Sequence, residues 1–413
     1  MIWLLKPAEL ILKGGNRKSF EKLLFQNMQK IFSKIDNKIK IRTTQGRYYL
    51  QIADNIEQIT ENKELELSIN KTINNDNHEL SGLEKINLIE NALSKLIGIS
   101  GWARTAVCEK TPEAVLAACA EEGKKLFANN KKTFKIDARR TDKSFPLSSY
   151  ELCCEGGEAV LTALPEMKVD IHNPDDIIRV EIREKAFIYS GGVQGLGGLP
   201  VGSAGRGMLL LSGGIDSPVA GFLMACRGMS IDAIHFHAYP YTSLEAKQKV
   251  IRLAQITGSF CLGIKLYILN FTKVQMRIKE RAPYPWTTVL LRMAMMEAAE
   301  KAALKIKCKC LITGESLSQV ASQTIENLNC TQSRMKLPVL RPLIGFDKHS
   351  IINEAKRIGT YDVSIEPFAD CCTLFSPPHP VLHGDVKEAN TLYESLELEE
   401  LIDEALREYE AVS

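Results

Sequence analysis

The first 75 residues show the pattern strand, helix, strand, strand. Short runs of alternating apolar and polar residues predict the strands, and apolar residues at helical spacing predict the helix. Gly46 lies between the second and third strands and is typical of a hairpin turn. A polar, Asn-rich stretch at residues 70–77 follows and predicts a linker. The predicted elements are Ile2–Leu5, Phe20–Ile35, Lys40–Thr43 and Tyr48–Ile52.

A second unit, from residue 76 to residue 190, mixes helical and strand patterns. Thr111 and Pro112 favour a helix start, because Thr caps helices and Pro suits their first turn. The segment Ile177–Tyr189 alternates apolar residues with charges, which predicts the half-solvated edge of a sheet. The other predicted elements are helices at Asn87–Leu96 and Pro112–Phe127 and strands at Ala103–Cys108 and Thr133–Ala138.

After a glycine-rich stretch at residues 190–207, strands and helices alternate. Within that stretch, residues 195–198 superficially resemble a dinucleotide-binding loop, but they lack the strand before and the helix after, so we expect a hinge or a loop beside the next site. The alternation beyond it predicts a parallel, doubly wound sheet. The acidic segment Glu388–Glu410 predicts a solvated helix. Predicted strands are Met208–Leu211, Ile231–His237, Leu262–Ile268 and Cys310–Thr313, and predicted helices are Pro218–Gly228, Leu244–Gly258 and Thr287–Leu304.

Composition narrows the class of protein. The apolar share of 45% and the charged share of 25% are ordinary for a soluble globular chain. No apolar run is long enough to span a membrane and no secretory signal is present, so we expect a cytoplasmic protein without a membrane partner. A net charge of +2 excludes a uniformly basic nucleic-acid binder, although local basic patches remain compatible with it. The eleven cysteines lack the paired spacing of a structural zinc site and are expected to be reduced thiols.

The most informative motif is Ser212-Gly213-Gly214-Ile215-Asp216-Ser217, which follows an apolar strand. Both glycines can adopt angles that turn amides toward a ligand, and Ser217 with Pro218 is expected to cap the next helix. Amides at the positive end of a helix form an anion site. Asp216 would repel a phosphate unless a metal ion lay between them, so we assign Asp216 to Mg²⁺. The motif lacks the Gly-Lys-Ser/Thr of a Walker A loop and resembles the loop of enzymes that cleave ATP to AMP and pyrophosphate.

Three further regions extend the resemblance over nearly the whole chain. Residues 9–17 resemble the opening of a ferredoxin-like domain, and residues 134–140 and 169–182 resemble a THUMP domain. Residues 197–202 precede the phosphate loop, as similar residues do in the family that combines these domains. Together they make the chain similar to the ThiI family of tRNA uridine 4-sulfurtransferases. The resemblance implies an α/β architecture with an N-terminal ferredoxin-like α+β domain (1–75), a THUMP RNA-binding domain (76–190) and a doubly wound PP-loop ATP pyrophosphatase domain, adenine nucleotide alpha hydrolase-like (191–413).

The family resemblance also implies an activity and a set of site residues. Such enzymes use ATP to adenylate O4 of the uridine at tRNA position eight and then replace AMP with sulfur from a persulfide. His235 and Phe236 end a predicted strand, where open α/β sheets bind ligands, and Gly314 permits close backbone approach. Arg292, taken alone, is more typical of a solvated helix. Matched residue by residue, the nucleotide contacts are Leu210, Leu211, Ser212, Gly213, Gly214, Asp216, Ser217, His235, Phe236, Arg292, Gly314 and Gln323.

Sulfur transfer needs a thiol, and Cys371-Cys372 lies in a predicted loop ahead of a proline cluster. The family's active cysteine occurs in this segment; alignment places it on Cys372, with Cys371 as the alternative. His379 and His383 either lower the thiol pKa or are ordinary exposed histidines, while buried cysteines such as Cys226 should be inert.

Many relatives end in a rhodanese domain that carries the persulfide, but the chain ends at Ser413 without room for one. We therefore expect sulfur to come directly from a cysteine desulfurase, or from another carrier, with the persulfide on Cys372 and Cys371 as an alternative resolving thiol. A role in thiamine biosynthesis depends in relatives on the rhodanese part and is disfavoured here.

A basic stretch between residues 124 and 143 is the expected tRNA contact. A solvated surface explains such a stretch equally well when the sequence is taken alone. Recognition should depend on RNA shape and backbone, with the target uridine leaving its stack. The expected RNA-binding residues are Lys13, Arg17, Lys135, Arg139, Arg140 and Lys143.

Two other functions remain open at this stage. A PP-loop ligase that adenylates a small molecule would share the phosphate loop but would not need an RNA-binding half. A noncatalytic tRNA-binding protein would bind tRNA without any effect of ATP. The sequence does not fix the oligomeric state, and a homodimer is kept as an expectation.

Overall fold

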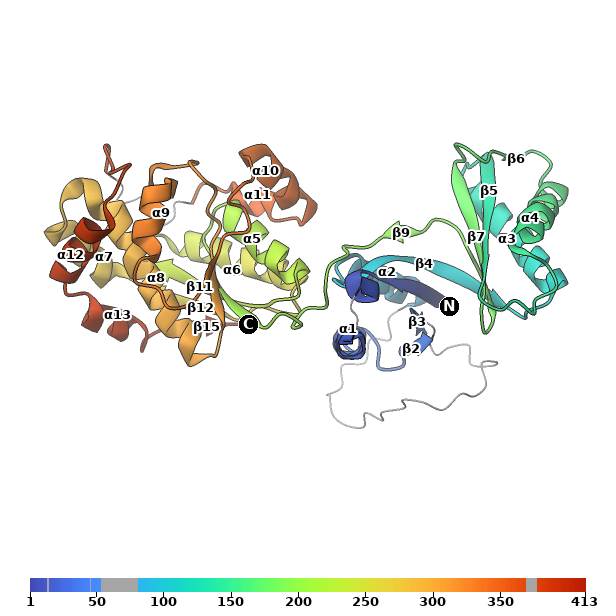
Figure 1. Ribbon diagram of the computed structural model, residues 1–413, viewed down its shortest axis with the longest axis horizontal. Helices are drawn as coiled ribbons and strands as arrows, with labels where there is room; N and C mark the ends of the chain where they lie inside the picture. Colours follow the sequence, from blue (N-terminus) through green and yellow to red (C-terminus); the bar gives the residue numbers. More distant parts are fainter. Residues whose placement is uncertain (13–14, 45, 53–80, 369–376) are drawn as a thin grey trace. The chain divides into compact units, whose positions relative to one another are not determined.

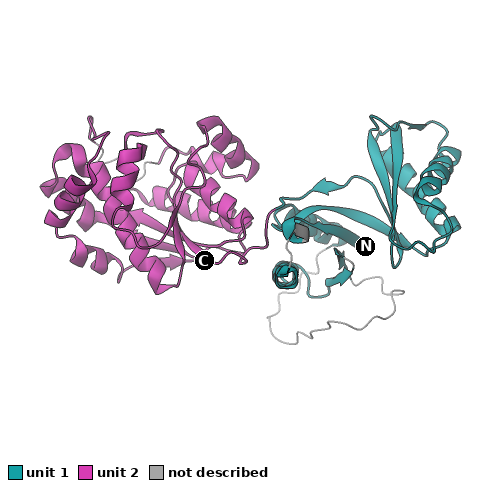
Figure 2. Cartoon of the chain, in the orientation of Figure 1, with its two compact units in different colours: residues 1–197 teal, residues 198–413 magenta. Residues whose placement is uncertain are grey.

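The computed structural model describes residues 1–12, 15–44, 46–52, 81–368 and 377–413 (Figure 1). They form two compact units, Met1–Gly197 and Gly198–Ser413 (Figure 2). The boundary falls within the glycine-rich stretch, where the sequence predicts a hinge or loop. The expected linker at residues 70–77 lies outside the described residues. The finer division into three domains, at residues 75 and 190, stays a prediction.

The first part of unit 1 is an antiparallel sheet in the order β2-β3-β1-β4, covered by two helices. Trp3 and Leu50 of the sheet pack with Leu24 of α1 and Leu93 of α2 in one apolar core. Helix α2 begins with a capping box between Ser81 and Glu84 and belongs by its packing to this first core. The elements are β1 (Ile2–Pro7), η1 (Glu9–Leu12), α1 (Arg17–Phe32), β2 (Lys40–Thr44), β3 (Arg47–Gln51), α2 (Gly82–Ser94) and β4 (Ile99–Cys108).

The second part of unit 1 is a sheet in the order β4-β8-β7-β5-β6, which shares the long strand β4 with the first. Two helices, α3 and α4, pack against each other and close an apolar core that includes Phe134, Val160 and Ile178. The elements are α3 (Pro112–Ala128), β5 (Thr133–Arg140), α4 (Ser149–Ala163), β6 (Lys168–Val169), β7 (Asp176–Ile182), β8 (Ala186–Tyr189) and β9 (Val193–Gln194).

The prediction that Ile177–Tyr189 forms a half-solvated edge is wrong. Strand β7 lies between β5 and β8 and is paired on both sides. Its charged residue Glu181 is buried, and accepts hydrogen bonds from the Tyr189 hydroxyl (2.8 Å) and from Arg183 Nε (2.7 Å). The alternating charges therefore mark a buried hydrogen-bonded network, and a pattern of polarity alone does not distinguish that from contact with solvent.

Unit 2 has a six-stranded sheet in the order β14-β13-β10-β11-β12-β15, parallel except for the edge strand β15. Helices cover both faces: Gly221 of α5 packs on Leu209, whereas Met208 packs in the core around α8, and neighbouring strand residues point to opposite faces. This is the doubly wound, mainly parallel α/β sheet that the sequence predicts.

The elements of unit 2 are β10 (Arg206–Leu210), α5 (Asp216–Cys226), β11 (Ser230–His237), α6 (Leu244–Gly258), β12 (Leu266–Asn270), α7 (Thr272–Arg281), η2 (Tyr284–Trp286), α8 (Thr287–Lys305), β13 (Cys310–Ile312), η3 (Ala321–Gln323), α9 (Ile325–Gln332), β14 (Val339–Leu340), α10 (Lys348–Arg357), α11 (Tyr361–Ser364), α12 (Val386–Ser395), α13 (Glu399–Ala405) and β15 (Glu410–Val412).

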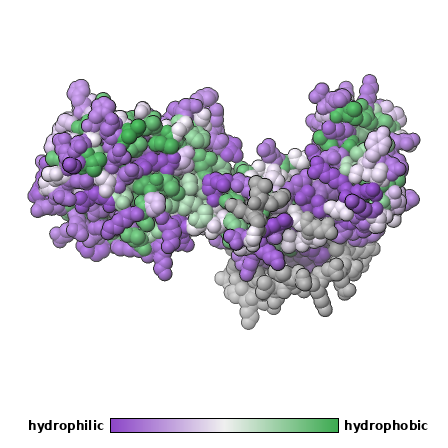
Figure 3. Space-filling view, viewed as in Figure 1, coloured by the Kyte–Doolittle hydropathy of each residue, from purple (hydrophilic) through white to green (hydrophobic). Residues whose placement is uncertain are grey.

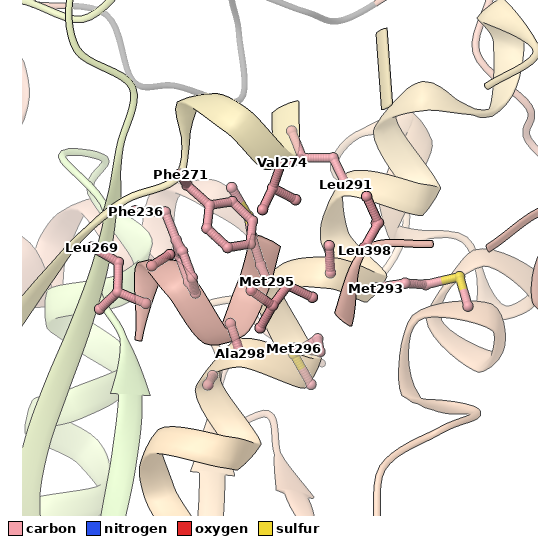
Figure 4. Packing of buried hydrophobic residues seen from close by; sticks show 14 of the residues in the cluster. Phe236, Leu269, Phe271, Val274, Leu291, Met293, Met295, Met296, Ala298 and Leu398 are labelled. Carbon is pink, nitrogen blue, oxygen red and sulfur yellow. The ribbon is translucent and has the colours of Figure 1, made fainter. Parts of the chain in front are cut away.

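The C-terminal acidic segment is not the single solvated helix that the sequence predicts. Helix α12 buries Tyr393 and helix α13 buries Ile402 in the main core of unit 2, together with Leu398, which directly precedes α13. Strand β15 then pairs antiparallel with β12. Figure 4 shows Leu398 in that core together with Met293 and Met296 of α8. The acidic residues lie on the outer faces of these helices, and apolar residues at helical spacing lie on the inner faces. The many charges make this apolar pattern difficult to recognise in the sequence.

No helix in the described ranges is long and apolar enough to cross a membrane. In the view of Figure 3, hydrophilic residues cover most of the described surface of each unit, with separate hydrophobic patches between them.

The buried C-terminal helices give a stability test. We expect Ile402→Ala to lower the free energy of unfolding by about 2–5 kcal/mol, because it removes a fully buried side chain from a packed core. Urea denaturation of the full chain measures this, with Glu400→Ala on the exposed face of the same helix as the control, expected to change stability by less than about 0.5 kcal/mol. Equal, small effects of both substitutions would show that α13 is a solvated helix after all.

Candidate functional site

The order of strands in unit 2 identifies one place where a ligand should bind. Strand β10 lies between β11 and β13. After β10 the chain first adds β11 and β12 on one side of it and later adds β13 and β14 on the other side. At such a switch point the loops after two neighbouring parallel strands separate, and a crevice opens at their carboxyl ends. The loop after β10 is the S-G-G-x-D-S motif, and the loop after β13 contains Thr313, Gly314 and Glu315.

The S-G-G-x-D-S loop is held by its own side chains. The Ser217 hydroxyl accepts a hydrogen bond from the Ser212 amide (2.9 Å), and the Ser212 hydroxyl accepts one from the Gly214 amide (3.2 Å). Helix α5 begins at Asp216, so Ser217 closes the loop instead of capping the helix, and its predicted capping role is wrong. Gly213 and Gly214 do not have positive φ values, so the loop does not use the left-handed conformation that the sequence allowed.

The loop after β13 lies directly against the loop after β10. A Cβ atom on Gly314 would come within 2.7 Å of the Ser217 amide nitrogen and 2.8 Å of the Ser217 Cα. Backbone atoms cannot move away as a flexible side chain can, so glycine is required at this position. This is the close backbone approach that the sequence analysis expected of Gly314.

A cavity of about 180 Å³ opens between these loops and the ends of the strands. Of the twelve residues expected to contact a nucleotide, ten line it; Gly213 and Gly214 do not, although they lie in the adjoining loop. Arg292, which taken alone suggested a solvated helix, is one of the lining residues. The cavity is lined by Leu210, Leu211, Ser212, Asp216, Ser217, His235, Phe236, Arg292, Met295, Met296, Thr313, Gly314, Glu315, Gln323 and Thr331.

The cavity has an apolar wall and a polar wall. Phe236, Met295 and Met296 form the apolar part and belong to the main core, where Figure 4 shows them together around Phe271. His235 is buried, and its Nδ1 lies 2.9 Å from the Leu211 carbonyl oxygen, which fixes its ring beside the loop. An apolar surface with a few fixed polar groups at one end suits a flat heterocycle that carries a charged tail.

Asp216 marks the charged end of the cavity. Its Oδ1 accepts a hydrogen bond from Lys348 Nζ (2.5 Å), and its Oδ2 accepts one from Gln319 Nε2 (2.8 Å). Lys348 was not predicted from the sequence; it lies in the first turn of α10, 132 residues further along the chain. Its signal was weak, since one lysine after the helix-capping residue Asp347 resembles many exposed lysines.

The residues present could hold a magnesium ion only if phosphate oxygens supplied further ligands. In the parts of the chain that the structure describes, no group of three or more His, Cys, Asp or Glu side chains could hold a metal ion alone. Mg²⁺ in nucleotide enzymes, however, is held by one or two carboxylates together with phosphate oxygens and water. Asp216 supplies one such carboxylate beside the phosphate-loop motif.

A second network holds Arg292, which also lines the cavity. Glu315 accepts hydrogen bonds from Arg292 Nη1 at Oε1 (2.7 Å) and from Arg341 Nε and the Thr313 hydroxyl at Oε2 (2.8 Å each). Arg341 Nη1 also donates to Gln332 Oε1 of α9 (2.7 Å). Glu315 and Arg341 were missed because their roles depend on contacts between β13, α8 and the segment after β14, which no local motif records.

Cys371 and Cys372 lie outside the described residues, so the structure gives no account of either thiol. The described chain on both sides of them is anchored to other elements of unit 2. Before them, the Ser364 hydroxyl donates to the Gly214 carbonyl (3.5 Å), and buried Lys249 donates to the Glu366 carbonyl (2.9 Å). After them, Asn327 binds the Val381 carbonyl (2.8 Å) and the Gly384 amide (3.2 Å).

Three cysteines of unit 2 are weakly acidic, of which Cys308 and Cys310 are buried and Cys226 is half-buried. Burial raises the pKa of the Cys226 and Cys308 thiols to about 12 and that of Cys310 to about 11. Thiols with such pKa values are not ionised near neutral pH and are poor nucleophiles. Cys226 is thus less buried than the sequence predicted, and its raised pKa supports the prediction that it is inert.

The expected RNA-binding residues do not form one group. Lys135 and Arg139 lie on the same face of β5, whereas Arg140 lies on the other face and donates to the Phe145 and Leu147 carbonyls (2.9 and 3.0 Å). Arg17 pairs with Glu21 at 2.7 Å, and Lys143 is exposed. Lys13 lies outside the described residues.

A group of basic residues that the sequence did not indicate surrounds Lys6. The pKa of Lys6 is lowered, mainly by burial and in addition by the positive charges of Arg179, Arg47 and Arg139, while the negative charge of Glu181 acts in the other direction. The four basic side chains come from β1, β3, β5 and β7, so only the folded sheet brings them together. The cluster Lys6, Arg47, Arg139 and Arg179 is therefore partly balanced by buried Glu181, which lies 3.5 Å from Arg47 Nε.

Comparison with protein families gives three matches that together cover most of the chain. Residues 2–64 match the ThiI ferredoxin-like domain, residues 109–190 match the THUMP domain, and residues 202–398 match the family described as thiamine biosynthesis protein (ThiI).

Curated relatives match over almost their whole length. A probable tRNA sulfurtransferase of Treponema pallidum (strain Nichols) is 44% identical over 406 residues, which cover 98% of this chain and 94% of the relative. One of Caldanaerobacter subterraneus is 40% identical over 402 residues, which cover 97% of both chains.

Solved structures extend the comparison to the fold. A 4-thiouridine synthetase, crystallised with RNA and bound ATP, is 32% identical with a TM-score of 0.85, over 100% of this chain and 98% of that one. The protein PH1313 of Pyrococcus horikoshii, 22% identical with a TM-score of 0.63 over 87% of this chain and 99% of that one, shares the fold. With the family matches and the long, closely similar relatives, this shows that the chain belongs to the ThiI family of tRNA sulfurtransferases.

Proposed function

We propose that the protein is an ATP-dependent enzyme that makes 4-thiouridine at position 8 of tRNA. In the first step the uridine O4 attacks the α-phosphorus of ATP and pyrophosphate leaves. In the second step persulfide sulfur attacks C4 of the uridine and AMP leaves. The observation that carries this proposal is the cavity at the switch point, which joins the S-G-G-x-D-S loop to an apolar wall.

ATP fits this cavity in one direction. We place the adenine against Phe236, Met295 and Met296, because a flat apolar ring is best accommodated on the apolar wall. The triphosphate then extends toward the amino end of α5, where the helix dipole and the loop amides favour negative charge. Arg292 and Lys348 lie at the polar end and supply positive charge.

Asp216 and Lys348 are proposed to handle the charge of the phosphates. Asp216 would hold a Mg²⁺ ion that enters with ATP, and such an ion stabilises negative charge on phosphate oxygens. Lys348, which pairs with Asp216 at 2.5 Å, is then free to donate to a phosphate oxygen. The ion pair thus keeps both charged groups in place until the nucleotide arrives.

The tRNA would be held mainly by unit 1. Exposed Arg139, with Lys6, Arg47 and Arg179 of the same cluster and half-buried Lys135 on the same face of β5, is suited to phosphate contacts. Arg140 is occupied by backbone carbonyls. Phosphate contacts of this kind release counterions, so binding should weaken steeply as salt rises. The target uridine must leave its stack to present O4 to the cavity.

Cys372 is proposed to carry the sulfur, delivered as a persulfide by a cysteine desulfurase. After its outer sulfur has displaced AMP, a thiolate attacks the Cys372 sulfur and breaks the S–S bond, which leaves sulfur on the base and a disulfide on the protein. Cys371 is the alternative carrier or the attacking thiol, and an external thiol then reduces the disulfide. In the described chain before the cysteines, the Ser364 hydroxyl donates to the Gly214 carbonyl of the phosphate loop, which supports a role of the following segment beside that loop. A homodimer stays a prediction.

ATP–pyrophosphate exchange that depends on tRNA tests the proposed function against its two rivals. The proposal requires exchange with unmodified tRNA and none without it. Exchange with a small carbonyl acceptor but not with tRNA would instead identify a small-molecule ligase. Tight tRNA binding with no exchange under any condition would identify a noncatalytic RNA-binding protein.

We expect Asp216→Ala to reduce tRNA adenylation at least about a hundred-fold, because it removes the carboxylate that handles the charge developing on the phosphates. Binding of tRNA, measured by filter retention, should not change. Asp362→Ala, which removes an exposed carboxylate of α11, is the matched control and should keep full activity. Normal adenylation by the Asp216 variant would contradict its assignment.

We expect Cys372→Ser to keep ATP–pyrophosphate exchange and to abolish 4-thiouridine formation, because only the second step needs the thiol. Cys154→Ser, at an exposed cysteine of unit 1, is the control and should support both steps. Mass spectrometry of the wild-type protein after reaction with the desulfurase should find the persulfide on Cys372. Equal loss of both steps in the Cys372 variant would refute this separation of roles.

A further inference from the structure

Glu315 is the residue around which the polar wall of the cavity is organised. Glu315 is 5% exposed. It lies in the loop after β13, next to Gly314, the residue that contacts the Ser217 backbone. Its two carboxylate oxygens bind different partners. In the described part of the chain Oε1 accepts a hydrogen bond from Arg292, whereas Oε2 accepts hydrogen bonds from both Arg341 and Thr313. One side chain therefore connects β13, α8 and the segment after β14.

We propose that Glu315 is a positioning residue that fixes the Arg292 guanidinium in the nucleotide cavity. Without a fixed acceptor, the long arginine side chain at the cavity edge, 27% exposed, would sample many rotamers. The hydrogen bond from Nη1 to Oε1 leaves the remaining N–H groups of Arg292 available to the cavity that it lines. The proposal rests on the proposed function, because ATP is the ligand whose binding it explains.

The charge balance of this group supports a role toward an anion. Glu315 contributes one negative charge, while Arg292 and Arg341 contribute two positive charges, and arginine does not lose its proton in proteins. Arg341 is itself almost buried, and its Nη2 has no hydrogen-bond partner among the described residues. A partly buried excess of positive charge is unfavourable unless a negative group balances it, and the phosphates of ATP are such a group.

A single substitution can release Arg292 and leave the rest of the network in place. Glutamine has the shape of glutamate but only one accepting oxygen, and its amide group donates. In Glu315→Gln the oxygen should turn toward Arg341 and Thr313, since two donors are then satisfied, and the amide group would face Arg292. The variant therefore removes the contact to Arg292 specifically and keeps the contacts that hold the fold.

Gln332→Leu is the matched control. It removes the acceptor of Arg341 Nη1, which does not line the cavity, and leaves the contact between Arg292 and Glu315 Oε1 unchanged. If Glu315 acts by holding Arg292, this variant should bind ATP within about three-fold of the wild type, because neither Glu315 nor Arg292 loses a partner. If the whole network is needed only for folding, Gln332→Leu and Glu315→Gln should have similar effects.

A double-mutant cycle tests the inference directly, with binding of the non-cleavable analogue α,β-methylene-ATP to the full chain measured by calorimetry. Glu315→Gln is expected to weaken binding at least about ten-fold, because it breaks a charge-assisted contact. In the Arg292→Gln background the same substitution should cause no further loss, since the residue that it positions is gone. Thermal unfolding of each variant monitors folding.

Three results would overturn the inference. They are unchanged affinity in Glu315→Gln, an equal loss in Gln332→Leu, or a loss on Glu315→Gln that is the same in both backgrounds, which would indicate a general structural role. Absence of analogue binding to the wild-type protein is a different outcome, and it would count against the proposed function itself.

Discussion

The site depends on how closely the loops after β10 and β13 approach each other. Gly314 packs so near the Ser217 backbone that one added methyl group would not fit, and the strand order places these loops on either side of a switch point. This contact fixes the wall that carries Glu315 and Arg292 relative to the loop that carries Asp216. Backbone geometry therefore determines where the charged side chains of the cavity lie. Side-chain pairs such as Lys348 with Asp216 add to this arrangement but do not determine it.

Much of this could be predicted from the sequence, because the relevant signals are local. The strand, the loop and the helix around Asp216 are contiguous, and ten residues that the family resemblance implied do line one cavity. Lys348, Glu315 and Arg341 could not be found in the same way, since each acquires its role through a partner on a distant element. The same limit explains the basic cluster around Lys6, whose members come from four strands of a sheet.

Two of the wrong predictions share one physical cause, which is that charge was taken as a sign of exposure. Glu181 is buried with its hydrogen-bond donors in the middle of a sheet, and the acidic C-terminal helices cover the core with Ile402 and Tyr393. Ser217 followed by Pro218 has the pattern of a helix cap, yet its hydroxyl closes the phosphate loop instead. Polarity along the chain reports which residues need partners, and only the fold shows whether water or protein supplies them.

The central claim is that one cavity activates a tRNA uridine with ATP and that sulfur then replaces AMP on the same base. The most direct measurement is mass analysis of tRNA nucleosides after reaction of unmodified tRNA with the protein, ATP, Mg²⁺, a cysteine desulfurase and isotopically labelled cysteine. The account requires labelled 4-thiouridine at position 8, formed only when ATP is present. Labelled sulfur at another position, its incorporation without ATP, or no thiolated nucleoside despite pyrophosphate release would contradict it.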